Sequence, residues 1–171
     1  MRRLARGHHP RPVLESLEPR LLLAGDVLIS ELMAINDSCL ADADGAYPDW
    51  LELHNAGASE VDLGGWALTD NADDLAKWVF PSVTLPAGGY LVVFASDKDR
   101  TDPAGELHTN FKLAGEGEYL ALVRPDGSVE HEYAPRYPAQ WADVSYGLEP
   151  GGAGEGFFST PTPGGPNGVA G

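Results

Sequence analysis

Apolar and polar residues alternate over short stretches of this chain, and small polar residues separate the stretches. Within residues 49–55, Leu51 and Leu53 alternate with polar neighbours, and residues 60–70 hold a second apolar series broken by two glycines. Alternation of this kind is typical of a strand with one buried face. We therefore predict a strand in each segment, joined through the turn-forming residues 55–59 into a hairpin-like nucleus.

The same pattern continues along the rest of the chain. It predicts further strands at residues 27–35, 75–81, 83–85, 90–96, 107–113, 118–124, 129–133 and 143–148. Residues 90–96 are apolar at both odd and even positions, which is typical of a strand covered on both faces near the centre of a sandwich. Residues 125–128 carry a strong turn signal, so the strands that flank them are expected to form a hairpin.

Composition agrees with an all-β chain. The 21 Gly and 14 Pro are spread without a period, and no amphipathic helical pattern occurs. About 43% of the residues are apolar, which is enough for one domain with a core. We predict a single β-sandwich with Trp66 as a core anchor.

Charge is distributed unevenly along the chain. Residues 1–26 hold five of the eleven basic residues and three acids, so the body carries six Lys or Arg against 23 Asp or Glu, a net charge of −17. Such a surface repels phosphate backbones, and we expect no nucleic-acid binding. The single cysteine, Cys39, excludes an internal disulfide and is expected to be a small structural residue.

Residues 1–25 form a basic arm that ends in a short apolar patch at residues 21–24. The patch is shorter than the apolar core of a secretory signal, which is about 7 to 15 residues long. The body contains no stretch approaching the roughly 20 apolar residues of a membrane span. At the other end, residues 159–171 lack core residues, and we predict an extended or flexible tail.

Several blocks of the sequence resemble a known family. The runs DWLELHN, VDLGGWALTD, KWVFP and LPAGGYLVVFASD, within residues 27–167, are similar to those of lamin-tail domains, the immunoglobulin-like modules found in nuclear lamins and in many exported bacterial proteins. The resemblance implies an immunoglobulin-like β-sandwich over residues 26–158. Residues 17–23, LEPRLLL, resemble the LEPR-x-L-L motif of large exported bacterial proteins, which implies export or surface display. A disordered basic arm is the alternative interpretation.

A search for catalytic chemistry finds no motif. No catalytic or cofactor-binding residue is predicted, and His8, His9, His54, His108 and His131 are expected to be surface or hydrogen-bonded residues. The loop at Asp42, Asp44 and Gly45 is half of a calcium motif and lacks its closing Glu, so an acidic turn is the alternative. Calcium remains an open possibility at this loop.

Three aromatic residues lie in a Pro-rich region and allow two interpretations. Tyr133, Tyr137 and Trp141 could cover one end of the core or form a flat surface that stacks on sugars.

The sequence thus predicts a non-catalytic structural or interaction module of an exported or cell-surface bacterial protein. The partner would be a protein or a cell-surface polymer, and the chain could be the first module of a larger multidomain protein. The alternatives are a carbohydrate-binding module and a calcium-dependent accessory domain of an extracellular hydrolase.

Overall fold

The computed structural model describes residues 26–152, 154–169 and 171, and within them the fold is all-β. Residues 1–25, including LEPRLLL, His8 and His9, lie outside the described part. The strands, with one short 3-10 turn η1, are β1 (Val27–Met33), β2 (Asp49–Asn55), β3 (Val61–Asp62), β4 (Ala67–Thr69), β5 (Trp78–Val79), β6 (Thr84–Leu85), β7 (Tyr90–Ala95), β8 (Leu120–Val123), β9 (Val129–Tyr133), β10 (Ser145–Leu148), η1 (Pro150–Gly152) and β11 (Glu155–Phe158).

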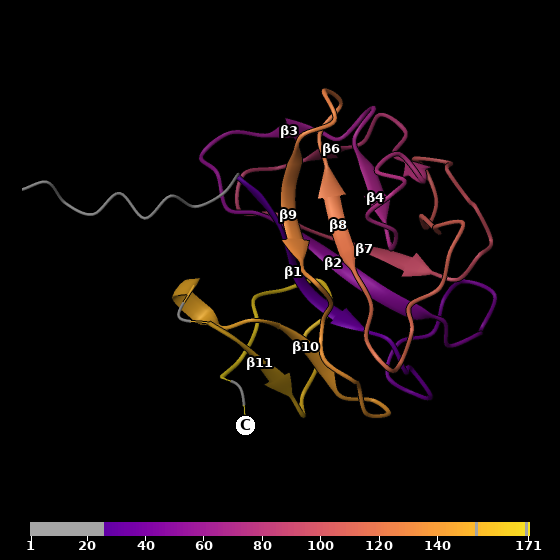
Figure 1. Ribbon diagram of the computed structural model, residues 1–171, viewed down its shortest axis with the longest axis vertical. Coiled ribbons are helices and arrows are strands. Elements are labelled where there is room, and N and C mark those ends of the chain that lie inside the picture. The colour runs from indigo at the N-terminus through magenta and orange to yellow at the C-terminus, as the bar shows by residue number, and fades with distance from the viewer. Residues whose placement is uncertain (1–25, 153, 170) are drawn as a thin grey trace, which may run out of the picture.

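Two antiparallel sheets form the sandwich, and a two-stranded β3–β6 pair supplements them. The larger sheet has the order β11-β10-β1-β2-β7, and the smaller has the order β5-β4-β8-β9. In Figure 1, β8 and β9 of the smaller sheet cross over β1 and β2 of the larger one. This arrangement confirms the predicted immunoglobulin-like β-sandwich.

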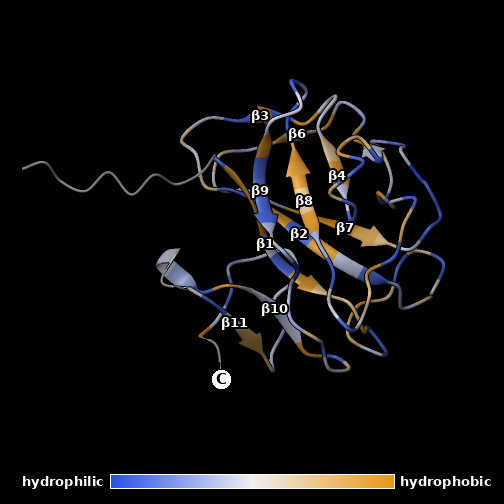
Figure 2. Ribbon diagram, in the orientation of Figure 1, coloured by the Kyte–Doolittle hydropathy of each residue, from blue (hydrophilic) through white to orange (hydrophobic). Residues whose placement is uncertain are grey.

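The core lies between the two sheets. Ile29, Leu53 and Val93 from the larger sheet and Leu68 and Leu122 from the smaller one belong to one cluster of buried side chains. Figure 2 shows β8 as hydrophobic along its length and β9 as largely hydrophilic. This difference follows from position, because all four residues of β8 are buried between neighbouring strands whereas β9 is an edge strand.

Strand β10 extends the larger sheet through a close approach at Gly147. A bulge in β1 lies between Ile29 and Glu31, and Glu31 is in register with Gly147. A Cβ atom at Gly147 would lie 2.1 Å from the Ser30 carbonyl oxygen. Only glycine therefore fits where β10 passes the bulge.

The nucleus predicted at residues 49–70 is correct in its strands and wrong in its pairing. Strand β2 pairs with β1 and β7, whereas β3 pairs with β6 and β4 pairs with β5 and β8. The two segments lie in different sheets because the glycine-containing connection at residues 64–65 turns the chain from the β3–β6 pair into the smaller sheet.

Three other local predictions need correction. Residues 107–113 form isolated bridges instead of a strand, and β7 is covered on both faces at Val93 and Phe94 but lies at the edge of its sheet. The apolar character of β7 follows from this cover, since Val93 packs into the main core and Phe94 into a separate cluster on the opposite face. The sequence pattern also missed β11 (Glu155–Phe158). By contrast, the predicted β8–β9 hairpin is confirmed.

Candidate functional site

The face of the larger sheet that points away from the core, here called the outer face, carries three rows of side chains. Registered partners on antiparallel strands place their side chains on the same face. The rows are an aromatic row (Leu28, His54, Tyr90), an acidic row (Glu31, Glu52, Val92) and a tryptophan row (Met33, Trp50, Phe94).

The acidic row places two buried carboxylates side by side on neighbouring strands. Glu31 and Glu52 are both fully inaccessible to solvent. Ser30 Oγ donates a hydrogen bond to Glu52 Oε1 at 2.7 Å, and Ser145 Oγ donates to Glu31. Like charges this close and this buried disfavour ionisation.

The electrostatics of the row follow from burial. Burial raises the pKa of Glu52 to about 7, and the nearby Glu31 carboxylate contributes to the rise, although hydrogen bonds from Ser30 and Gly164 oppose it. Burial also raises the pKa of Glu31, against hydrogen bonds from Ser145 and Thr162. Glu52 therefore titrates near neutrality, in a range where strand carboxylates are ordinarily ionised.

A C-terminal segment, residues 161–167, covers the acidic row and is here called the strap. Thr162 N donates to Glu31 Oε1 at 3.1 Å, and Gly164 N donates to Glu52 Oε2 at 2.5 Å. Asn167 Nδ2 donates to the carbonyl oxygens of Ser30 and Leu148, each at 2.8 Å. In Figure 1 the yellow C-terminal segment runs beside β10 and β11.

The strap differs from the free tail that its composition predicts. It lacks large apolar residues, as the sequence shows, and polar contacts attach it to the sheet instead. The sequence did not single out Glu31 as a site residue. A single acid within an apolar strand gives the same pattern as a strand with one solvent-exposed position. The register of β1 with β2, which brings it to Glu52, depends on a bulge that alternation does not reveal.

The aromatic row forms the floor of a pocket of about 430 Å³. The walls come from residues 148–152, which follow β10, and from Pro166 and Asn167 of the strap. The rings of His54 and Tyr90 stack at a centroid distance of 4.3 Å with an interplanar angle of 4°. The pocket therefore combines an aromatic floor with largely apolar walls, the usual composition of a ligand site.

The proposed calcium loop is already occupied by cationic side chains. Lys98 Nζ pairs with Asp42 and lies 2.7 Å from Asp44 Oδ2, and Arg100 Nη2 lies 2.6 Å from the same oxygen. Hydrogen bonds from Arg100 and then Lys98 lower the pKa of Asp44 to about 2. Burial acts to raise the pKa of Asp42, but the Lys98 bond and backbone N–H donors lower it overall.

The oxygens of this loop also accept internal bonds. Asp42 Oδ1 accepts the backbone N–H groups of Asp44 and Ala46, both at 3.0 Å, as an acidic turn does. Among the residues that the structure describes, no group of three or more His, Cys, Asp or Glu side chains is arranged to hold a metal ion.

The three candidate aromatics do not form one surface. Tyr133 and Tyr137 are buried, and their hydroxyls donate to the carbonyl oxygens of Ile29 and Ala114. Trp141 is 61% exposed. It lies against Phe157 of β11 in an edge-to-face contact with centroids 4.6 Å apart.

The other residues singled out from the sequence, His108, His131 and Cys39, show no arrangement for catalysis in the part of the chain that the structure describes. The ring of His131 accepts a weak bond from Ile29 N at 3.4 Å, and Cys39 is exposed. Ser96 Oγ lies 2.8 Å from Nδ1 of His108, a contact between a hydroxyl and an imidazole base. His108 is fully buried and its ring stacks on Phe94, as expected for a core histidine.

These features define an immunoglobulin-like β-sandwich with a pocket on the outer face of one sheet. The chain belongs to a family, because the model of the Lamin Tail Domain matches residues 23–135. Domains of this family are non-catalytic and of the protein-interaction type. A search of curated proteins finds no match. Strands β10 and β11 and the strap lie beyond the matched residues.

In the described part of the chain, no helix has the length and apolar character to cross a membrane.

Proposed function

We propose that this chain is a non-catalytic binding module that acts outside the cytoplasm as part of an exported or cell-surface bacterial protein. The observation that carries the binding role is the open pocket on the outer face, where the neighbouring acidic row is covered by the strap. The LEPRLLL sequence at residues 17–23 supports export.

Cell fractionation tests the location. In the native host, antibody against the full chain should detect the protein at the cell surface or in the medium. Replacing residues 17–23 with a Gly-Ser segment of equal length should retain it in the cytoplasm. A wild-type protein found only in the cytosol would refute export.

The non-catalytic role is tested at the contact between Ser96 and His108. The wild-type chain and Ser96→Ala should hydrolyse chromogenic activated esters at the same rate. His108 is buried, and its Nδ1 is engaged in the contact with Ser96. Ester hydrolysis that requires Ser96 would contradict the proposal.

Carbohydrate binding is a second candidate, favoured by one observation. Trp141 presents an exposed indole beside Phe157, and aromatic rings of this kind stack on sugars. Polysaccharide should then protect Trp141 fluorescence from iodide quenching, and Trp141→Ala should abolish that protection. Protection that persists in the variant would come from the partly buried Trp66, since Trp50 and Trp78 are buried, and it would reject this role.

A further inference from the structure

The aromatic row offers two ring systems whose polar atoms are not otherwise engaged. Within the described residues, neither the imidazole of His54 nor the hydroxyl of Tyr90 has a hydrogen-bond partner, and both residues line the pocket. Burial lowers the pKa of His54, so its imidazole is neutral at pH 7. The floor is therefore a neutral aromatic surface, which attracts cations through its negative faces.

A carboxylate at the rim supplies the complementary charge. Glu149 lines the same pocket, and in the described part of the chain its side chain makes no ion pair. Glu52 of the acidic row lies two residues before His54 on the same face of β2. A cation entering this pocket would meet the stacked ring pair and an unpaired carboxylate.

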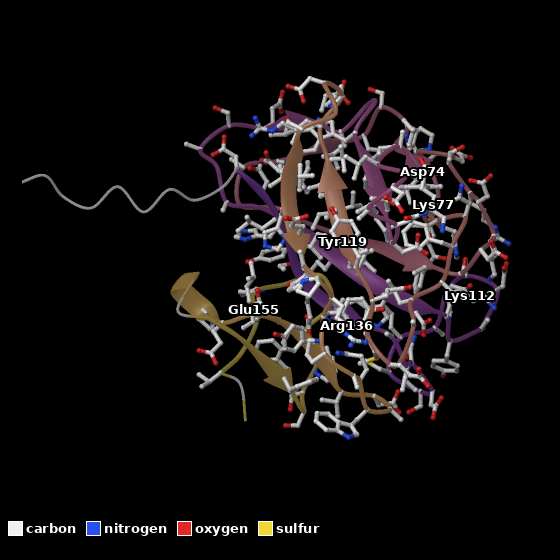
Figure 3. All side chains as sticks on the ribbon, viewed as in Figure 1. Asp74, Lys77, Lys112, Tyr119, Arg136 and Glu155 are labelled. Atoms are coloured by element: carbon white, nitrogen blue, oxygen red, sulfur yellow. The ribbon has the colours of Figure 1, made fainter. Side chains whose placement is uncertain are left out.

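Four of the six Lys and Arg side chains of the body are engaged away from this position. Lys77, Lys98, Arg100 and Arg124 are each paired with an acid elsewhere. Figure 3 shows Lys77 and Lys112 on the side of the molecule away from Glu155, whose strand follows the pocket wall η1. With a body charge of −17, the surrounding field favours positively charged partners and repels anions.

We propose that this pocket receives the side chain of a lysine or arginine from a basic peptide segment of a partner protein. The aliphatic stem would pack against apolar walls such as Pro150 and Pro166, and the charged head would lie between Tyr90 and Glu149. This proposal rests on the proposed binding role and adds the chemistry of the partner.

Binding of a labelled peptide tests the proposal. Fluorescence anisotropy of fluorescein-labelled hexalysine should rise saturably with the full chain at physiological ionic strength. Hexaglutamate and hexaserine with the same label should not bind. Absence of hexalysine binding, or equal binding of hexaserine, would overturn the proposal.

Variants separate the pocket from general attraction between opposite charges. Tyr90→Ala and Glu149→Gln should each weaken hexalysine binding by about fivefold or more. Tyr90→Phe keeps the ring and should bind nearly as the wild type does. Asp73→Asn removes one negative charge from an exposed loop and should change affinity by less than about twofold. If Glu149→Gln and Asp73→Asn weakened hexalysine binding equally, the pocket would not be the binding site and the proposal would be overturned.

The basic arm of the chain is the other possible occupant. A full chain with Arg2, Arg3, Arg6, Arg11 and Arg20 replaced by Gln should bind hexalysine as the wild type does. Binding that becomes at least tenfold tighter would show that the arm fills the pocket. That result would overturn the proposal that a partner protein supplies the basic side chain. Failure of these tests leaves the location of the protein unaffected, whereas a cytosolic location would refute the proposed function without changing hexalysine binding.

Discussion

Glu52 is a buried residue whose titration should change the stability of the domain near neutral pH. Burial raises its folded-state pKa to about 7 from an ordinary 4.5. The folded state therefore holds the proton more tightly than the unfolded state, so the contribution is fully present below about pH 4.5 and is lost as pH rises through 7. The full loss would be roughly 3 kcal/mol, since each unit of pKa difference corresponds to about 1.4 kcal/mol.

The prediction concerns the pH slope of unfolding. The denaturant concentration at the unfolding midpoint of the wild type should decrease as the pH is raised from 5 to 8. In Glu52→Gln this dependence on pH should be weaker. The groups around Glu52 are Glu31 from β1, His54 and Tyr90 from the aromatic row, and Gly164 from the strap, of which Glu31 titrates in the same direction. Glu60→Gln, at an exposed position, is the matched control and should keep the wild-type slope. Identical slopes in both variants would contradict the prediction.

At the scale of single residues, the sequence indicated which aromatic side chains matter for packing but not which of them are fully buried. Trp66 was expected to anchor the core, and in the structure it is partly buried at the margin while Trp50 and Trp78 are buried. Tyr133, Tyr137 and Trp141 were expected to share one role, either covering the core or stacking on sugars, but only the two tyrosines face the interior. Burial of an aromatic ring depends on which sheet covers it, and alternation along one strand does not carry that information.

At the scale of elements, the docking of β10 depends on Gly147. In Gly147→Ala the new Cβ atom would collide with the backbone of Ser30, so either β10 must separate from β1 or the bulge must rearrange. We expect a loss of about 3 kcal/mol or more in the free energy of unfolding, measured by urea titration. Gly168→Ala has open space around the added atom and is the matched control, with an expected change within about 0.5 kcal/mol. A mild effect at Gly147 would mean that β10 does not pack as described.

The strap is the second element that can be tested by one substitution. Asn167→Ala removes both amide bonds, to the carbonyls of Ser30 and Leu148, and leaves those acceptors without their partner. The expected loss is about 1–2 kcal/mol, together with faster amide exchange at Thr162 and Gly164. Val169→Ala lies at an 89% exposed position and should leave both measurements unchanged. Unchanged exchange in Asn167→Ala would mean that other contacts suffice to hold the strap.

Element prediction succeeded where the signal is local and failed where it depends on distant partners. The β8–β9 hairpin is specified by a turn signal between two apolar segments, and it forms as expected. Strand β11 holds two adjacent phenylalanines instead of an alternating pattern, and the strap lacks large apolar residues. Their positions depend on hydrogen bonds to β10, Glu31 and Glu52. Such long-range polar contacts leave no periodic pattern in the sequence.

For the whole molecule, net charge is the property that sequence alone determines best. A body at −17 stores self-repulsion in the folded state, so added salt should raise the melting temperature gradually. The charge count also includes acids that are already paired, such as Asp42, Asp44 and Asp70. Screening should therefore stabilise mainly through the unpaired acids.

The cation response separates screening from a specific site. Lys98 and Arg100 already contact the Asp42 and Asp44 carboxylates, so calcium would have to displace both side chains to bind there. We expect equal concentrations of calcium and magnesium to raise the melting temperature similarly, without saturation below the millimolar range. Asp44→Ala should retain the same response. Saturable stabilisation by calcium that exceeds that by magnesium and disappears in Asp44→Ala would instead establish a ligand-binding loop, because only a ligand of the folded state stabilises by mass action.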